Sequence, residues 1–461
     1  MFSLEETDGP NSLADRTKSE SLPFNIHNCI TYKPYAQKRG EIMKVEEVLK
    51  TCWISRLDRY RNPPLINFGV GSAGKIGKVA DDIAQGKEAI IVTDKGIEKA
   101  GLIKEARESL EEENFEVDVY ASEAGEPTVK TTKEVIDAMS KRDYGLVVGI
   151  GGGSCMDKAK IGACLSKSPG ELGEYLAPNA KEIMGSIPKI MIPTTSGTGS
   201  EVSNTAVVIM PHAEVGTMKT WITGDLVLAE AAVVDPSLTL GLPPKITAGS
   251  GFDALSHTAE AVLSIQANPI SDALSLKAVE LVAENLRTAY HQGNNLEARW
   301  NMSLAAMIGG WVIGFEWVAG PAVLGHVASE GISPHCHIPH GEACGVLLPY
   351  VYYFNLPDSY AKRKLAAIAR AMGIDVSGLS TRKAAERAIT ATFDLLKDVD
   401  LPTNLSQYAF SGDDIPMLVR YIERRAEEMY SMSRYNPRKA TTKNLEEFFR
   451  QALRGREALG L

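Results

Sequence analysis

The chain has 461 residues, of which 44% are hydrophobic and 23% are charged. These fractions are typical of a folded globular protein of two or three domains and exclude intrinsic disorder as the main state. The formal net charge of −9 disfavours a nucleic-acid-binding protein. The sequence contains no run of about 18 apolar residues, so we expect no membrane span. Its six cysteines include no CxxC pair, which favours reduced thiols.

Residues 1–60 are polar and are expected to form an N-terminal extension. Their first twenty residues lack the apolar segment of a secretory signal, so we expect a cytoplasmic protein. The extension is either an arm that docks on a partner subunit or a partly ordered terminus, and the pattern does not decide between them.

From residue 65 onward, short runs rich in Val and Ile alternate with amphipathic helical segments. The predicted strands are 65–70, 88–94, 115–120, 145–151, 189–195 and 206–210. Helical spacing covers 96–112 and 130–142. This alternation predicts a parallel sheet covered on both faces, in a Rossmann-like α/β domain that we assign to residues 61–242.

Two features of the first strands indicate a dinucleotide. Gly69–Gly74 is a GxGxxG sequence after a strand, and Asp94 ends the next strand 20 residues after Gly74. An acidic side chain at that spacing can accept from a ribose 2′-OH and repels a 2′-phosphate, which favours NAD over NADP. The alternative is a glycine-rich turn without a ligand.

Two further loops follow buried strands. Gly151–Gly153 and Ser154 open a helix, where successive glycines let backbone N–H groups approach a phosphate; close packing is the alternative. Residues 193–201 combine threonine and serine hydroxyls with glycines, which suits a ribose or diphosphate, although a solvated turn is the alternative.

After Pro243 the apolar spacing becomes helical. The helical segments are 250–264, 270–290, 295–314, 360–373, 381–399, 414–430 and 444–453. Residues 243–461 are therefore predicted to form an all-α domain.

This helical part contains candidate metal ligands. Asp253 and His257 are four residues apart on one predicted helix, so they share a face. Half of the eight histidines fall in one window, at His326, His335, His337 and His340. Any two of them with Asp253 and His257 would make a four-ligand site suited to Zn²⁺ or Fe²⁺. Cys336 and Cys344 compete for this role, but no cysteine pair has ligand spacing.

Together these motifs resemble the iron-containing (group III) alcohol dehydrogenase family. The matching segments are GGGSCMDKAK, PTTSGTGSEVSNTAV, VVDPSLTLGLPPKITAGSGFDALSHTAEA, NPISDALSLKAVELV, GHVASEGISPHCHIPHG and NPRKATTKNLEEFFRQAL. The resemblance covers residues 65–461. It implies a dehydroquinate-synthase-like architecture with a helical metal-binding domain over residues 243–461.

The resemblance also implies site residues. The metal would be held by Asp253, His257, His326 and His340, which leaves His335 and His337 as extra histidines. The cofactor would contact Asp94, Gly151, Gly152, Gly153, Ser154, Asp157, Thr194, Thr195, Thr198 and Lys219. The turn at Gly69 becomes an entry turn beside the cofactor. Glu330 stands where many members have a histidine near the nicotinamide, four residues after the third ligand, and it and His340 are the candidate catalytic residues.

The implied function is an NAD-linked alcohol dehydrogenase or aldehyde reductase that uses Fe²⁺, with NADP and Zn²⁺ as alternatives. A small alcohol or aldehyde would be its substrate, and Phe315 and Trp317 would either line an apolar pocket or pack in the core. We expect a homodimer or higher homo-oligomer. The alternative functions are a hydroxyacid–oxoacid transhydrogenase and a sugar-phosphate cyclase-type lyase.

Overall fold

The computed structural model describes residues 64–178, 180–315, 323–429 and 435–461. The predicted extension over residues 1–60 and the candidate pocket residue Trp317 therefore lie outside the described residues. All described residues belong to one compact unit, Glu46–Leu461.

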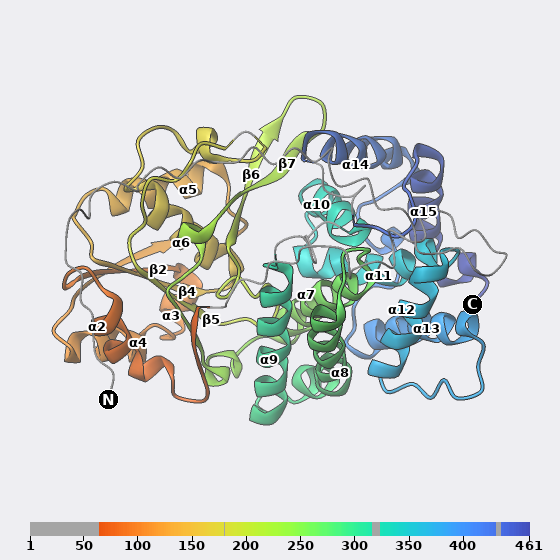
Figure 1. The fold of residues 1–461 in the computed structure, drawn as a ribbon, viewed down its shortest axis with the longest axis horizontal. Helices are drawn as coiled ribbons and strands as arrows, with labels where there is room; N and C mark the ends of the chain where they lie inside the picture. The colour runs from red at the N-terminus through yellow and green to blue at the C-terminus, as the bar shows by residue number, and fades with distance from the viewer. Residues whose placement is uncertain (1–63, 179, 316–322, 430–434) are drawn as a thin grey trace, which may run out of the picture. The chain divides into compact units, whose positions relative to one another are not determined.

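The first half of the described chain contains a six-stranded parallel sheet (Figure 1). Its strands are β1 (Leu65–Phe68), β2 (Glu88–Asp94), β3 (Glu116–Ser122), β4 (Leu146–Gly151), β5 (Lys189–Pro193) and β8 (Ala231–Val234). They lie in the order β1-β8-β5-β4-β2-β3, and every neighbouring pair is parallel. Strands β4 and β5 are buried along their whole length, as in a sheet covered on both faces. The predicted parallel sheet is thus confirmed.

Helices cover both faces of this sheet. They are α2 (Ile76–Ile83), α3 (Lys95–Lys99), α4 (Lys104–Glu112), α5 (Val129–Met139) and α6 (Gly153–Leu165). Alternate strand residues enter two cores: Ile91 and Val148 pack with α2 and α4, whereas Ile90 and Val147 pack with α5 and α6. The segment predicted as one helix over 96–112 is broken at Gly101, whose φ of +74° ends α3 before α4 begins.

A two-stranded antiparallel hairpin lies outside the main sheet. It consists of β6 (Thr205–His212) and β7 (Gly216–Thr223). The strand predicted over 206–210 is therefore real, but it pairs with a neighbour that we did not predict. Strand β8 was also missed, because a four-residue Ala-Val run is too short to show a period.

The rest of the described chain is helical, as predicted. Its helices are α7 (Pro244–Leu263), α8 (Pro269–His291), α9 (Leu296–Ile313), α10 (Leu324–Cys336), α11 (His340–Asn355), α12 (Ser359–Ala371), α13 (Thr381–Asp398), α14 (Ile415–Met429) and α15 (Thr442–Arg454). We did not predict α10 and α11. Each contains an internal proline, Pro334 and Pro349, a residue that usually ends a helix.

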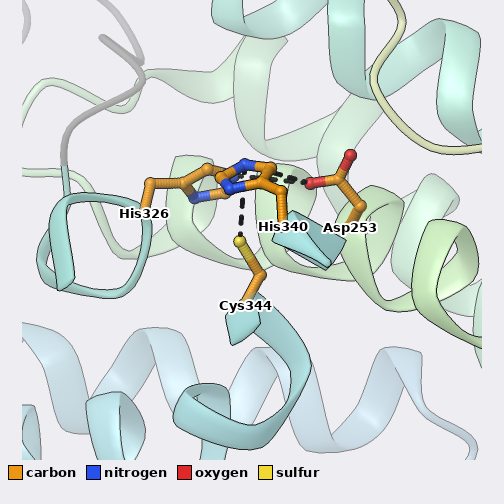
Figure 2. A group of neighbouring side chains, drawn as sticks. All are labelled: Asp253, His326, His340 and Cys344. Carbon is orange, nitrogen blue, oxygen red and sulfur yellow. Dashed lines mark hydrogen bonds and ion pairs between the residues drawn. The ribbon is translucent and has the colours of Figure 1, made fainter. Parts of the chain in front are cut away.

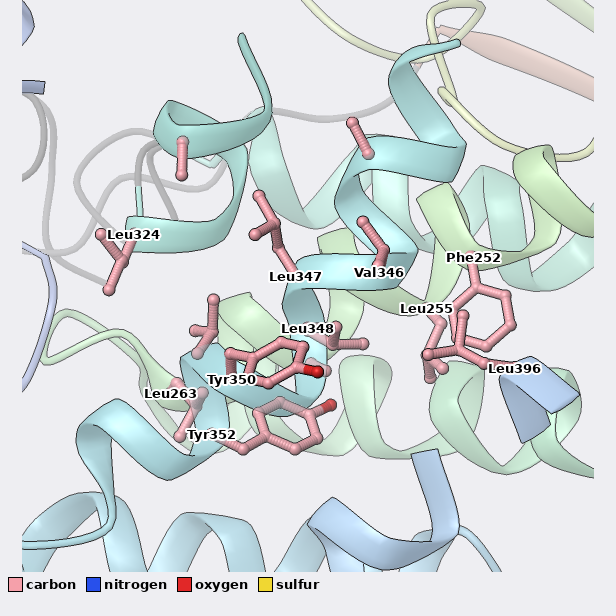
Figure 3. Packing of buried hydrophobic residues seen from close by; sticks show 14 of the residues in the cluster. Phe252, Leu255, Leu263, Leu324, Val346, Leu347, Leu348, Tyr350, Tyr352 and Leu396 are labelled. Carbon is pink, nitrogen blue, oxygen red and sulfur yellow. The ribbon is translucent and has the colours of Figure 1, made fainter. Parts of the chain in front are cut away.

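The apolar core of this part centres on α7 and α11. Figure 3 shows Phe252 and Leu255 of α7 near Val346 and Leu348 of α11, all of them buried. Helix α7 is buried on every side from Thr247 to Leu263 apart from one residue, so polar side chains on it lie deep in the protein. Among the described residues, no helix combines the length and apolarity needed to cross a bilayer.

Close backbone contacts join the α/β part to the helices. A Cβ added to Gly310 of α9 would lie 2.2 Å from the carbonyl oxygen of Gly199, so only glycine fits there. The hydroxyls of Ser196 and Ser303 are 3.0 Å apart. The loop after β5 is thus held against α9, next to α7.

Candidate active site

The carboxyl ends of β2 and β4 mark the point where the strand order reverses. The chain leaves β2 for β3 on one side and returns to β4 on the other side. Open α/β sheets bind ligands outside the carboxyl ends of the strands at such a switch point. Asp94 and Gly151 are the last residues of these two strands, so the sheet topology brings two predicted cofactor residues to this edge.

The N-terminus of α6 lies in the glycine loop and has no side-chain cap. Gly152 is the N-cap. Gly151 has a φ of +151°, and a Cβ on Gly153 would lie 2.7 Å from the hydroxyl oxygen of Thr198. The backbone N–H of Thr194 donates to the carbonyl of Gly151 at 2.9 Å. The structure therefore brings the glycine loop and the threonine loop, residues 194–199, into contact.

Asp94 has a structural role in addition to its predicted one. Its Oδ1 accepts from the backbone N–H groups of Gly96 and Ile97 at 2.8 and 2.9 Å, which caps α3. The thiol of Cys155 donates to its Oδ2 at 3.3 Å. Any substitution of Asp94 thus changes the start of α3.

Asp157 is turned toward the protein. Its Oδ1 accepts from the hydroxyl of Ser200 at 2.6 Å, and its Oδ2 accepts from the backbone N–H of Val207 at 3.1 Å. Lys160 lies 3.5 Å from the same carboxylate. Asp157 therefore links α6 to the threonine loop and the hairpin.

The four predicted metal ligands converge. The Oδ1 atom of Asp253 lies 3.8 Å from Nδ1 of His257, 3.8 Å from Nε2 of His326 and 3.8 Å from Nε2 of His340. Helix α7 supplies the first two residues, and α10 and α11 supply one histidine each. Three of the side chains are buried, whereas that of His340 is 19% exposed. Figure 2 shows Asp253 pointing toward the rings of His326 and His340.

The same side chains fit a divalent cation. Asp253 Oδ1, His257 Nδ1 and His326 Nε2 are buried without a hydrogen-bond partner, which is costly unless something else pairs with them. Two donors about 2.0–2.2 Å from one ion lie at most about 4.4 Å apart, so separations of 3.8 Å are compatible with a shared ion. Carboxylate and imidazole donors suit Fe²⁺ or Zn²⁺.

The electrostatics favour the ligand forms of Asp253, His257 and His340, whereas His326 would have to give up a proton to bind a metal. Burial opposes ionisation of Asp253, but the neighbouring imidazoles hold its pKa below the ordinary value. Burial lowers the pKa of His257 to about 4, and burial together with the Lys219 ammonium lowers the pKa of His340. Burial also disfavours a charged His326, but Cys344 and a glutamate beside it raise its pKa. An anionic carboxylate and neutral imidazoles are the species that bind metals.

Glu260 is an outer partner of this group that we did not predict. Its Oε1 lies 3.2 Å from Nδ1 of His326, and its Oε2 accepts from the backbone N–H of His326 at 3.4 Å. Metal-ligating histidines commonly face a carboxylate with their second nitrogen, which fixes the ring. The signal was present in the sequence, because residues 253, 257 and 260 share one face of a helix.

Cys344, one of the two cysteines that compete for a ligand role in the sequence, lies next to this group. It lies one turn after His340 on α11, with Sγ 3.7 Å from Nε2 of His340 and 3.1 Å from Oγ of Ser329. Ligand atoms of Asp253, His326, His340 and Cys344 all lie within 4.8 Å of one another (Figure 2). Cysteine spacing alone could not find it, because its partners are imidazoles and a carboxylate.

The other two histidines of the window lie elsewhere. Nε2 of His335 is 2.8 Å from Oδ1 of Asp414. His337 is exposed and follows α10 in the left-handed region, with a φ of +53°. Phe315 is buried edge-to-face against Trp311 with ring centroids 5.6 Å apart, so it packs in the core.

Glu330 and Lys219 lie beside the metal-ligand group. Glu330 is one turn after His326 on α10, and its Oε2 accepts from Nε and Nη2 of Arg425 at 3.0 and 2.8 Å. The negative charge at this position is therefore balanced from α14. Burial disfavours a charged Lys219, but Glu126, 3.7 Å away, and Glu330 raise its pKa.

The fold and the site define a class: Rossmann-like α/β proteins whose helical part holds a buried group of potential metal ligands. Residues 63–236 match the family described as iron-containing alcohol dehydrogenase, and residues 247–453 match the C-terminal part of the Fe-containing alcohol dehydrogenase family. The chain belongs to the iron-containing alcohol dehydrogenase family.

Named relatives agree with this assignment. Long-chain-alcohol dehydrogenase 1 of Geobacillus thermodenitrificans is 34% identical over 360 residues, which cover 78% of this chain and 88% of the relative. A crystal structure of 1,3-propanediol oxidoreductase is similar with a TM-score of 0.79 and 30% identity, over 86% of this chain and all of the other. Sulfoacetaldehyde reductase from Bifidobacterium kashiwanohense, solved in complex with NAD⁺, has a TM-score of 0.74 and 29% identity, over 86% of this chain and 99% of the other.

Proposed function

We propose that the protein is a metal-dependent, NAD-linked alcohol dehydrogenase or aldehyde reductase. One observation carries the proposal: Asp253 and three histidines converge with buried, unpartnered donor atoms in the part of the chain that adjoins the sheet's ligand edge. The names of the similar alcohol dehydrogenase and sulfoacetaldehyde reductase, and the NAD⁺ bound to the latter, support it.

In this proposal residues 61–242 form the nucleotide-binding domain. The open N-terminus of α6 at Gly151–Ser154 would hold the diphosphate, since backbone N–H groups and the helix dipole favour anions. The hydroxyls of Thr194, Thr195 and Thr198 would hydrogen-bond the cofactor across the glycine loop. Asp94 would accept from the ribose and disfavour NADP. NAD is the expected cofactor, with NADP as the alternative.

Residues 243–461 would form the metal-binding domain. Asp253, His257, His326 and His340 would hold Fe²⁺ or Zn²⁺, and Glu260 would orient His326. When bound, the cation supplies Lewis-acid chemistry at an alcohol or carbonyl oxygen, and the nicotinamide supplies hydride transfer.

Lys219 and Glu330 would order the reacting groups. The Lys219 ammonium, balanced by Glu126, would attract anionic parts of the cofactor to the site. Arg425 holds the Glu330 carboxylate in an ion pair. The carboxylate held in this way would orient the alcohol. We further propose that the protein acts in the cytoplasm as a homodimer or higher homo-oligomer on a small-molecule substrate.

The test is reduced-nicotinamide absorbance with Fe²⁺- or Zn²⁺-loaded protein and a panel of primary alcohols and aldehydes. Net NADH formation from an alcohol, lost in His340→Ala, is expected. Phosphate elimination from a sugar phosphate without net redox change would replace the proposal with a lyase. Turnover that requires an oxoacid acceptor, with NAD retained on the protein, would replace it with a transhydrogenase.

A further inference from the structure

The environment of Cys344 differs from that of the other cysteines among the described residues. The Cys155 thiol donates to Asp94 at 3.3 Å, and the Cys164 thiol donates to the carbonyl of Leu226 at 3.2 Å, which are ordinary contacts of a buried thiol. Cys344 likewise donates to the hydroxyl of Ser329 at 3.1 Å, but it also faces an imidazole nitrogen of the metal-ligand group. Its side chain is buried, so it does not serve as a solvent-exposed redox thiol.

The geometry allows Cys344 to share an ion with the neighbouring ligands. Zinc–sulfur and zinc–nitrogen bonds of about 2.3 and 2.1 Å allow a sulfur-to-nitrogen distance of up to about 4.4 Å. The distance from Sγ to Nε2 of His340 is 3.7 Å. Asp253 Oδ1 and His326 Nε2 belong to the same group of four donors, and both are buried without a hydrogen-bond partner. Their lack of partners indicates a shared ion and does not depend on the position of Cys344.

We propose that Cys344 is a thiolate ligand of the zinc form of this centre, together with Asp253, His326 and His340, and that it biases the centre toward Zn²⁺ over Fe²⁺. The inference rests on the proposed metal site and specifies its chemistry. Thiolate is a soft donor that favours zinc, whereas a carboxylate with three imidazoles also suits iron. His257 falls outside this group of four, so the inference refines the ligand set for Zn²⁺: Cys344 would take the place of His257, which would remain the fourth ligand of Fe²⁺.

Binding of the metal by Cys344 would exchange a proton for the cation, without electron transfer. The Cys344 S–H bond breaks, its proton passes to solvent, and a metal–sulfur bond forms with both electrons from sulfur.

The test uses Co²⁺ as a spectroscopic substitute for Zn²⁺ in the full-length protein. Thiolate ligation gives an intense sulfur-to-cobalt charge-transfer band in the near ultraviolet, which imidazole and carboxylate ligands do not give. We expect this band at one equivalent of Co²⁺ in the wild type, its loss in Cys344→Ser and its retention in the matched control Cys336→Ser. In parallel, Cys344→Ser should lower Zn²⁺ affinity by at least about tenfold, since loss of even an outer partner costs about that much, and should leave Fe²⁺ affinity nearly unchanged.

Bound Co²⁺ without the band in the wild type overturns the inference, and this result does not depend on whether any variant folds. Persistence of the band in folded Cys344→Ser also overturns it. In both cases net NADH formation from alcohols would leave the proposed function standing. Failure of the wild type to bind Co²⁺ or Zn²⁺ at all would overturn the metal site and the proposed function together.

Discussion

Glu260 offers a sharp test of the metal centre, because it touches a ligand and no predicted ligand role falls on it. Its Oε1 lies 3.2 Å from Nδ1 of His326, and the carboxylate is buried beside the ring. A buried carboxylate there fixes the ring so that Nε2 faces Asp253, and it makes the imidazole a better donor. Glu260→Gln keeps the shape and one acceptor oxygen but removes the charge.

The expected cost follows from that contact. Loss of an outer carboxylate typically lowers metal affinity by about 10–100-fold, or about 1.4–2.7 kcal/mol. Because glutamine retains an acceptor, we expect about tenfold for Glu260→Gln and about 100-fold for Glu260→Ala. The affinity is measured by competition between the protein and a chelator for Zn²⁺.

A matched control is available on α13. Glu386 is a mostly buried carboxylate that pairs with Arg382 and Lys383, far along the chain from the ligands. Glu386→Gln should leave metal affinity unchanged. If folded Glu260→Gln and Glu260→Ala both bind Zn²⁺ as tightly as the wild type, then His326 is not a ligand oriented by Glu260, and the assignment of the centre is wrong.

Three further predictions concern the α/β part. Burial raises the pKa of Glu201 from 4.5 to about 7. Between these pH values the unfolded chain releases a proton that the folded protein keeps. The free energy of unfolding therefore falls as pH rises from 4.5 to 7, by about 3 kcal/mol. Glu201→Gln should therefore be more stable than the wild type at about pH 8 and not at about pH 4 in urea unfolding; equal pH profiles would contradict this. Asp94→Ser keeps a capping hydroxyl for α3 but removes the charge, so the NAD-over-NADP preference in kcat/KM should fall by about tenfold or more; an unchanged ratio would remove Asp94 from cofactor selection. Gly153→Ala places a Cβ 2.6 Å from Cγ2 of Thr198 and should raise KM for NAD while Zn²⁺ affinity stays constant; a wild-type KM would refute the glycine loop as a cofactor contact.

Much of the architecture could be predicted because its signals are local. Runs of Val and Ile mark the buried strands, and apolar spacing marks seven of the helices after Pro243. The failures have local causes as well. Helices α10 and α11 were not predicted because each contains a proline, Pro334 or Pro349, which usually ends a helix. Gly101 divides the segment 96–112, whose apolar spacing predicted one continuous helix.

The metal-ligand group was predictable only in part. Asp253 and His257 share a helix turn, and the histidine window stands out, but the spacing could not choose among the four histidines. The structure brings together His326 and His340 because α10 and α11 begin beside α7. The Arg425 partner of Glu330 could not be predicted, because 95 residues separate them and only tertiary packing pairs them.

A crystal structure of the iron-loaded protein with NAD, with anomalous data at the iron edge, tests the central claim most directly. We expect one anomalous peak within bonding distance of Asp253, His326 and His340, the nicotinamide ring next to that peak and the diphosphate at Gly151–Gly153. A peak at another position, or a dinucleotide bound away from the glycine loop, would contradict it.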